Sequence, residues 1–188
     1  MKKILFAVSV FIFALCASAS AQNDPDVVEE VRAFYAAAKE KIKLADGEQS
    51  PRNDAVVTLN YNVPGTGPRT VVAHCYFDLD TDEDGAHYYP YFITLKYNVA
   101  AREFYEEYLF YPEAGRLQFV FIQQDTFDGT RNEERYYYDD LGKLAAVNIK
   151  GERTVEDAAL VSHAEDLRMI IPKYLDFPYS AVWGAKKS

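Results

Sequence analysis

The sequence is poor in the residues that most often carry chemistry. Its 188 residues include three histidines, two cysteines and one tryptophan. It contains no G-x-S-x-G, no H-E-x-x-H and no phosphate-binding glycine loop, which are signatures of common hydrolases, zinc proteases and nucleotide-binding proteins. Whether the chain is an enzyme stays open at this point, although the lack of these motifs favours a non-enzymatic protein.

Basic residues are also scarce, since 20 lysines and arginines face 29 aspartates and glutamates, for a net charge of −9. Phosphate backbones and anionic lipid heads repel so acidic a chain. We therefore expect neither nucleic acid nor a membrane surface as a partner.

Long apolar runs are lacking except near the first residue. There, Lys2 and Lys3 precede ILFAVSVFIFALCA, and the small residues 18–21 follow. This pattern predicts a secretory signal over residues 1–21, cleaved after Ala21. Leu15 stands where a lipoprotein signal carries a small residue, which disfavours a lipid anchor on Cys16.

The predicted mature chain, residues 22–188, is long enough for one domain with a single core. Loss of two lysines takes its net charge from −9 to −11. We expect an exported protein, periplasmic or extracellular, with no membrane span after cleavage.

Cleavage would leave Cys75 as the one cysteine, which excludes an intramolecular disulfide. Cys75 alternates with apolar residues along one face of a predicted strand, so we interpret it as a buried thiol. His74 points to the opposite face, and adjacent strand residues cannot form a Cys–His dyad.

The periodicity predicts two helices and seven strands. An aspartate cap at Asp24 and a stop at Gly47 bound a helix whose apolar stripe is Val27, Val31, Phe34, Tyr35, Ala38 and Ile42. Strands are predicted over 55–63, 68–79, 88–98, 103–111, 117–125, 132–138 and 143–149. A second helix starts at the Thr154–Asp157 capping box and ends near Pro172.

Short connections between consecutive strands favour antiparallel neighbours. The predicted fold class is therefore α+β: an N-terminal helix, a curled seven-stranded antiparallel meander and a C-terminal helix. The tail after the second helix is expected to wrap onto the body, with Trp183 as an anchoring contact.

The predicted sheet is wider than its two helices, at roughly 34 Å against roughly 20 Å. The strand around Leu117–Ile122 is apolar on both faces, which a sheet covered on one side does not require. Strong curling, burial by a partner, or an aromatic binding face each explains this pattern.

An internal repeat relates EYLFYPEAGRLQFV over 107–120 to ERYYYDDLGKLAAV over 134–147 without a gap, at an offset of 27 residues. Each copy has an aromatic strand end, an acidic turn, glycine, a basic residue and leucine. The unit resembles the hairpins of YD-repeat and MORN-like families. The resemblance covers two copies, implies an extracytoplasmic β-hairpin scaffold and transfers no catalytic residue.

An acidic segment, DLDTDEDGAHYYPY over 78–91, begins like a calcium loop when it is followed from Asp80. Asp80, Asp82 and Asp84 occupy the first three ligand positions and Gly85 follows, but Tyr91 stands where a bidentate glutamate is needed. A calcium site, a solvated acidic turn and a transition-metal role for His87 are the alternatives here.

Fifteen tyrosines form the other functional lead. Tyrosine combines flat apolar area with a polar tip, which suits recognition at a wet surface, although the same rings also fill small β cores. We predict Tyr88, Tyr105, Tyr136 and Tyr138 as ligand-binding residues.

The expected function is a non-enzymatic binding or envelope-associated role, with carbohydrate, peptide or an envelope protein as partner. A calcium-stabilised module and a secreted hydrolase with paired carboxylates are the alternatives.

Overall fold

A computed structural model describes residues 24–65, 67–83, 85–100, 102–111, 114–126, 128–151 and 155–169. Within these ranges the order is α1 (Pro25–Asp46), β1 (Asp54–Val63), β2 (Gly67–Asp82), β3 (Gly85–Val99), β4 (Arg102–Phe110), β5 (Leu117–Asp125), β6 (Arg131–Tyr138) and β7 (Leu144–Lys150). A second helix follows over 157–169.

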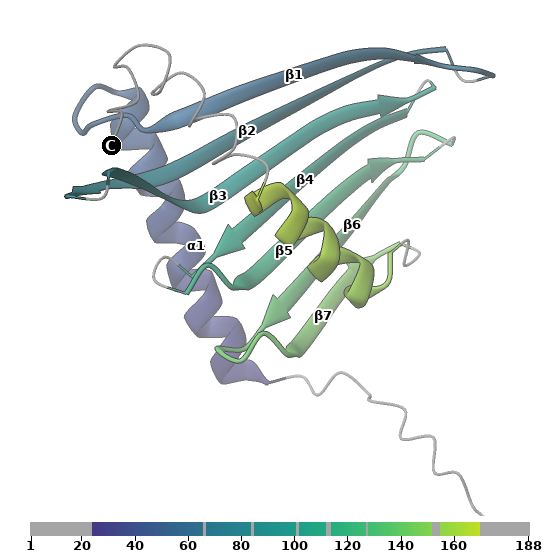
Figure 1. Cartoon of the computed structure of the whole chain (residues 1–188). Coiled ribbons are helices and arrows are strands. Elements are labelled where there is room, and N and C mark those ends of the chain that lie inside the picture. Colours follow the sequence, from purple (N-terminus) through teal and green to yellow (C-terminus); the bar gives the residue numbers. More distant parts are fainter. Residues whose placement is uncertain are drawn as a thin grey trace, which may run out of the picture.

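The strands form one open antiparallel sheet in the order β1-β2-β3-β4-β5-β6-β7 (Figure 1). The predicted α+β meander is therefore confirmed. The predicted bounds of the second hairpin were too short, because β2 continues to Asp82 and pairs there with Gly85 of β3. The alternating Asp–x–Asp pattern continues the strand instead of leaving it as a loop.

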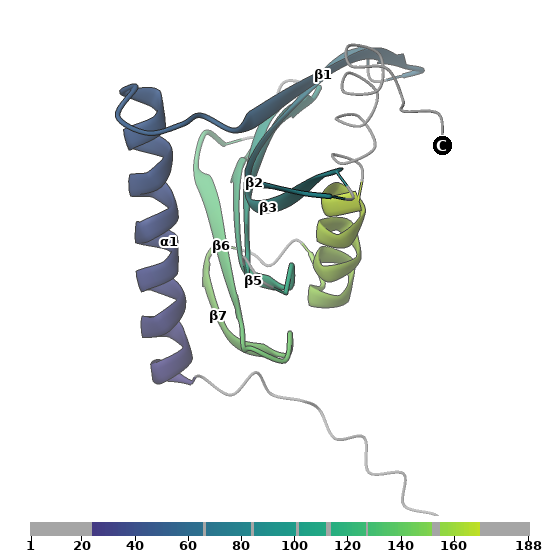
Figure 2. The same ribbon diagram turned by 60° about the vertical axis from the view of Figure 1, so that its left-hand side comes forward.

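The two helices lie on opposite faces of the sheet. In Figure 2, α1 stands on one side and the second helix on the other, with the bent sheet between them. Each face has its own core cluster, one with Leu160, Ala164 and Leu167 of the second helix and one with Val31 and Ala38 of α1. This arrangement explains why the central strands are apolar on both faces.

Helix α1 begins and ends as its sequence predicts. The Asp24 carboxylate accepts hydrogen bonds from the backbone N–H groups of Asp26 and Val27, at 3.1 and 3.4 Å. Gly47 closes the last turn by donating to the Lys43 carbonyl at 3.0 Å. Of the predicted stripe, Phe34 departs from expectation because its side chain remains 37% exposed.

Some predictions fall on residues outside the described ranges. These are the signal segment 1–21, Asp84, Thr154 of the capping box, Pro172 and Trp183. Among the described residues, no helix is long and apolar enough to cross a membrane.

Candidate functional site

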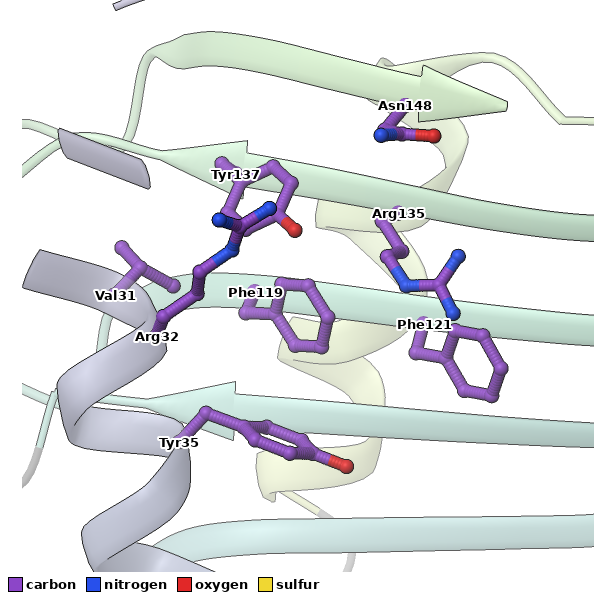
Figure 3. A pocket seen from close by; sticks show the side chains of 8 residues that line it. All are labelled: Val31, Arg32, Tyr35, Phe119, Phe121, Arg135, Tyr137 and Asn148. Carbon is purple, nitrogen blue, oxygen red and sulfur yellow. The ribbon is translucent and has the colours of Figure 1, made fainter. Parts of the chain in front are cut away.

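A hollow of about 430 Å³ lies between α1 and strands β5 to β7. Figure 3 shows Arg32 and Tyr35 reaching into it from α1, opposite side chains that rise from the sheet. We name this hollow the α1 groove and define it by its lining: Val31, Arg32, Tyr35, Phe119, Phe121, Arg135, Tyr137 and Asn148.

The floor of the α1 groove follows from the strand register. Phe121, Arg135 and Asn148 pair across β5, β6 and β7, so their side chains form one row on the α1 face. Phe119 and Tyr137 form the next row, with ring centroids 5.1 Å apart. The floor is thus an aromatic surface with an arginine and an amide at one side.

Two arginines approach this aromatic floor. The Arg135 guanidinium carbon lies 4.9 Å from the centroid of the Phe121 ring, and one of its N–H groups donates to Glu133 at 2.9 Å. Arg32 is exposed and makes no hydrogen bond or ion pair with any part of the chain that the structure describes. The Arg135 guanidinium is therefore stacked on Phe121 and partly paired with Glu133, whereas the donors of the Arg32 guanidinium are open to solvent.

Tyr35 is held in place by a buried carboxylate. Its hydroxyl donates to Glu107 at 2.6 Å, and the Tyr105 hydroxyl donates to the same carboxylate at 2.7 Å. The Lys39 ammonium group lies 3.2 Å from the same Glu107 carboxylate and completes the cluster. Burial, and secondly the bond to Glu107, raise the pKa of Tyr35 above its ordinary value, so this hydroxyl stays protonated at neutral pH.

A second hollow of about 650 Å³ extends the groove toward the start of α1. It shares Arg32, Tyr137 and Asn148 with the first and adds Val28 and Glu29 of α1. The two hollows therefore adjoin, and Arg32 lines both.

The four predicted tyrosines do not share one surface. Tyr136 and Tyr138 are buried, at 0% and 2% exposure, in the core cluster beneath the second helix, so their rings do not reach the surface. Tyr88 is half-buried in the same cluster, edge-on to Phe77 at 5.4 Å.

Tyr105 lies on the other face and borders the α1 groove, since its ring centroid is 6.5 Å from that of Phe121. The α1 face thus brings Tyr105 close to residues that the sequence did not single out as ligand-binding, chiefly Arg32 and Arg135.

The acidic segment belongs to the β2–β3 hairpin. Asp80 and Asp82 are exposed residues of β2, paired with His87 and Gly85 of β3. The Asp82 carboxylate lies 3.0 Å from His87 Nε2. Among the described residues, no three His, Cys, Asp or Glu side chains gather closely enough to hold a metal ion. Asp84 lies outside those residues, and calcium binding stays a prediction.

Another polar cluster joins β1 to β2 on the α1 face. Asp54 Oδ2 lies 2.5 Å from His74 Nε2, and His74 Nδ1 lies 3.0 Å from the Tyr76 hydroxyl. Arg52 donates twice to Asp54, at 3.0 and 2.8 Å, and this bond is the main reason that the pKa of Asp54 is lowered. Burial raises the pKa of Tyr76, so its hydroxyl is not an activated nucleophile.

Cys75 is buried, as predicted, with 1% of its surface exposed in the cluster beneath the second helix. Burial, with a smaller contribution from Asp54, raises the pKa of its thiol to about 12. A thiol in this state is a poor nucleophile at neutral pH.

Besides Glu107, two further carboxylates are buried and bonded to tyrosines. Glu106 and Glu134 face the second helix, whereas Glu107 faces α1. Glu106 accepts from Tyr97 at 2.7 Å and from Tyr108 at 2.5 Å. Tyrosine hydroxyls occupy both carboxylate oxygens of Glu106 and of Glu107, so these two residues do not form the water-flanking pair that the hydrolase alternative needs.

No protein-family model, curated protein or solved structure matches this chain. By its fold and its α1 groove, the chain is an α+β protein with an aromatic, arginine-bearing depression between a helix and its sheet.

Proposed function

We propose that this protein binds, without transforming it, a ligand that joins a negatively charged group to a flat apolar ring. The α1 groove is the binding site. The observation that carries the proposal is the pair of guanidinium groups, Arg32 and Arg135, beside an aromatic floor in a chain of net charge −9.

The α1 groove carries two guanidinium groups although the chain as a whole is acidic. Arg32 has all its donors available, and Arg135 donates to Glu133 through one N–H group. Guanidinium groups carry five donors in a planar fork that matches a carboxylate. The acidic surface elsewhere repels anions, so the groove is favoured over other surface positions as the place where one docks.

The aromatic part of the ligand would lie on the floor. Tyr35 stands edge-on to Phe119, at 5.3 Å between ring centroids, and Glu107 holds its hydroxyl. Because these rings are already positioned, a flat ligand meets them without a large loss of side-chain entropy. Of the predicted partners, a peptide that carries a carboxylate beside an aromatic residue has both chemical features, whereas a neutral sugar lacks the charge.

The lining also supports binding over catalysis. The eight residues that define the α1 groove include no Ser, Thr, Cys, His, Asp or Glu, although Asp24 and Glu29 line the hollow that adjoins it. Nucleophilic and general acid–base mechanisms draw on those groups. The raised pKa of Tyr35 keeps its hydroxyl from acting as a base near neutral pH.

The experiment compares two matched probes, naphthoate and the neutral naphthylmethanol, by isothermal titration of the mature protein. We expect naphthoate to bind at least about tenfold more tightly, because charge-assisted hydrogen bonds contribute about 1.5–3 kcal/mol. Arg32→Gln and Arg135→Gln should each remove most of that preference.

Arg131→Gln is the control, since Arg131 pairs with Asp125 at 2.8 Å outside the groove lining. Circular dichroism checks that each variant folds. Equal binding of the two probes, or an equal loss in the Arg131 variant, would overturn the proposal.

We also propose that the protein works outside the cytoplasm. The support is the pattern of residues 1–21: two lysines, an apolar run and small residues before the expected cleavage point. Expression of the full sequence in a bacterial host, followed by amino-terminal sequencing, should give a chain that starts at Gln22. A chain that retains Lys2 and Lys3 and stays in the cytosol would contradict this part.

A further inference from the structure

An apolar surface lies over β1 and β2 on the face that carries the second helix. We name it the β1–β2 apolar face and define it by Val57, Leu59, Tyr61, Val71 and Ala73, which alternate along the two strands. Leu59 and Tyr61 are 52% and 45% exposed. Contiguous exposed apolar groups of this kind commonly mark a docking surface.

This surface continues the core beneath the second helix. Val71 and Ala73 already pack against the margin of that core cluster. In the register, Leu59 pairs with Val71, which pairs in turn with Tyr97 of β3. The described part of the second helix covers the core but leaves Leu59 and Tyr61 open.

The second helix runs across the sheet from β6 toward β3. Near its start, the Val155 carbonyl accepts a hydrogen bond from Tyr136 of β6 at 2.9 Å. In its middle, the His163 ring lies 5.8 Å from Tyr108 of β4. Its last described turn lies beside β3 in both Figure 1 and Figure 2. The helix therefore crosses the sheet toward β2 and β1.

The sequence that follows has the composition to cover this surface. Residues 170–188 read IIPKYLDFPYSAVWGAKKS, with eight large apolar or aromatic side chains: Ile170, Ile171, Tyr174, Leu175, Phe177, Tyr179, Val182 and Trp183. An extended chain spans about 3.3 Å per residue, and neighbouring strands lie about 4.8 Å apart. A few residues beyond the helix are thus enough to reach β1.

We propose that the segment 170–188 of the same chain docks on the β1–β2 apolar face, with Trp183 as its main anchor. The segment completes the second core, and it leaves the α1 groove on the opposite face open to ligand. A second copy of the chain is the competing occupant, and the experiment separates the two.

Trp183 is the single tryptophan of the chain, so its emission and its quenching by acrylamide report on this contact alone. In the mature protein we expect blue-shifted emission and weak quenching. Leu59→Ser should shift the Trp183 emission to longer wavelength and raise the quenching constant at least about twofold, because the indole ring loses its apolar contact with Leu59.

Val56→Ser is the matched control. Val56 lies on the same strand with 57% exposure but points to the α1 face, so this variant should leave Trp183 unchanged. Equal effects of the two variants, or wild-type emission equal to that of the denatured chain, would overturn the proposal.

Cross-linking gives a second test that does not depend on the folding of Leu59→Ser. A short bis-maleimide should join Ala185→Cys to Leu59→Cys within one chain, but should not join it to Val56→Cys. Cross-links between chains, together with a concentration-dependent dimer in sedimentation that Leu59→Ser dissolves, would assign the surface to a second copy and contradict the proposal.

Discussion

At the scale of residues, tyrosine hydroxyls serve as the partners of buried carboxylates. Tyr105 donates to Glu107, Tyr108 to Glu106 and Tyr136 to Glu134, each pair two residues apart on one strand. Side chains at i and i+2 share a face of a strand, so the pairing is local. Much of the tyrosine content thus has a structural explanation: its hydroxyl groups satisfy carboxylates that enter the core, and Lys39 joins them at Glu107.

Glu107 gives the sharpest test of this role. Glu107→Gln removes the carboxylate charge that accepts hydrogen bonds from Tyr35 and Tyr105 and pairs with Lys39. We expect the free energy of unfolding, measured in urea, to fall by about 1–2 kcal/mol. Glu103→Gln, on the same strand, is the control. Its carboxylate is 67% exposed and 3.9 Å from Lys96, so its loss should stay within about 0.5 kcal/mol. Equal losses would refute a special role for the buried carboxylate.

The sequence did not predict that the residues lining the α1 groove lie together. Arg32 sits on the helix face that its charge pattern marks as solvated, and nothing local links it to Arg135. The register that aligns Phe121, Arg135 and Asn148 is a property of the folded sheet. The one available signal was Arg135 itself, a cation directly before the tyrosine run 136–138.

At the scale of elements, the order of helices and strands was predictable because caps, turns and alternation are local. The placement of the helices on opposite faces was not, since periodicity shows that a helix has an apolar stripe but not which face of the sheet it covers. The strand β5 is apolar on both faces, and this pattern indicated that both faces of the sheet are covered. The structure has a core cluster on each face.

The repeated hairpins differ in one contact that mutation can measure. Gly115 and Gly142 occupy equivalent turns with φ of +60° and +77°. Alanine at either position should cost about 1 kcal/mol from backbone strain. A Cβ at Gly115 would also stand 2.7 Å from Arg168 Nη1 of the second helix, whereas Gly142 faces open space.

We therefore expect Gly115→Ala to lower the melting temperature more than Gly142→Ala does. The difference should be modest, because the end of an arginine side chain can shift. A larger loss for Gly142→Ala would argue against the second helix packing over the β4–β5 turn.

At the scale of the whole molecule, the buried tyrosines predict sensitivity to alkali. Burial is the leading cause that raises the pKa of Tyr35, Tyr91, Tyr97, Tyr105 and Tyr108 above the ordinary value of 10.0. Above about pH 10 the unfolded chain releases these protons while the folded chain keeps them. The free energy of unfolding should consequently be fully retained below that pH and fall as the pH rises.

Far-ultraviolet circular dichroism and phenolate absorbance, followed together through an alkaline titration, check this expectation. Part of the phenolate signal should appear in one step with the loss of strand structure. If all tyrosines titrate near pH 10 while the fold persists, the buried hydroxyl network is not as the structure has it.

If the α1 groove binds an anionic aromatic ligand, amide NMR spectra of the mature protein titrated with naphthoate will show it at individual residues. We expect saturable shifts at the backbone amides of Phe121, Arg135 and Asn148 and along the first turns of α1. Signals from β1 and from the β2–β3 turn should stay in place. Shifts confined to β1 and β2, or no saturable shift at millimolar naphthoate, would contradict it.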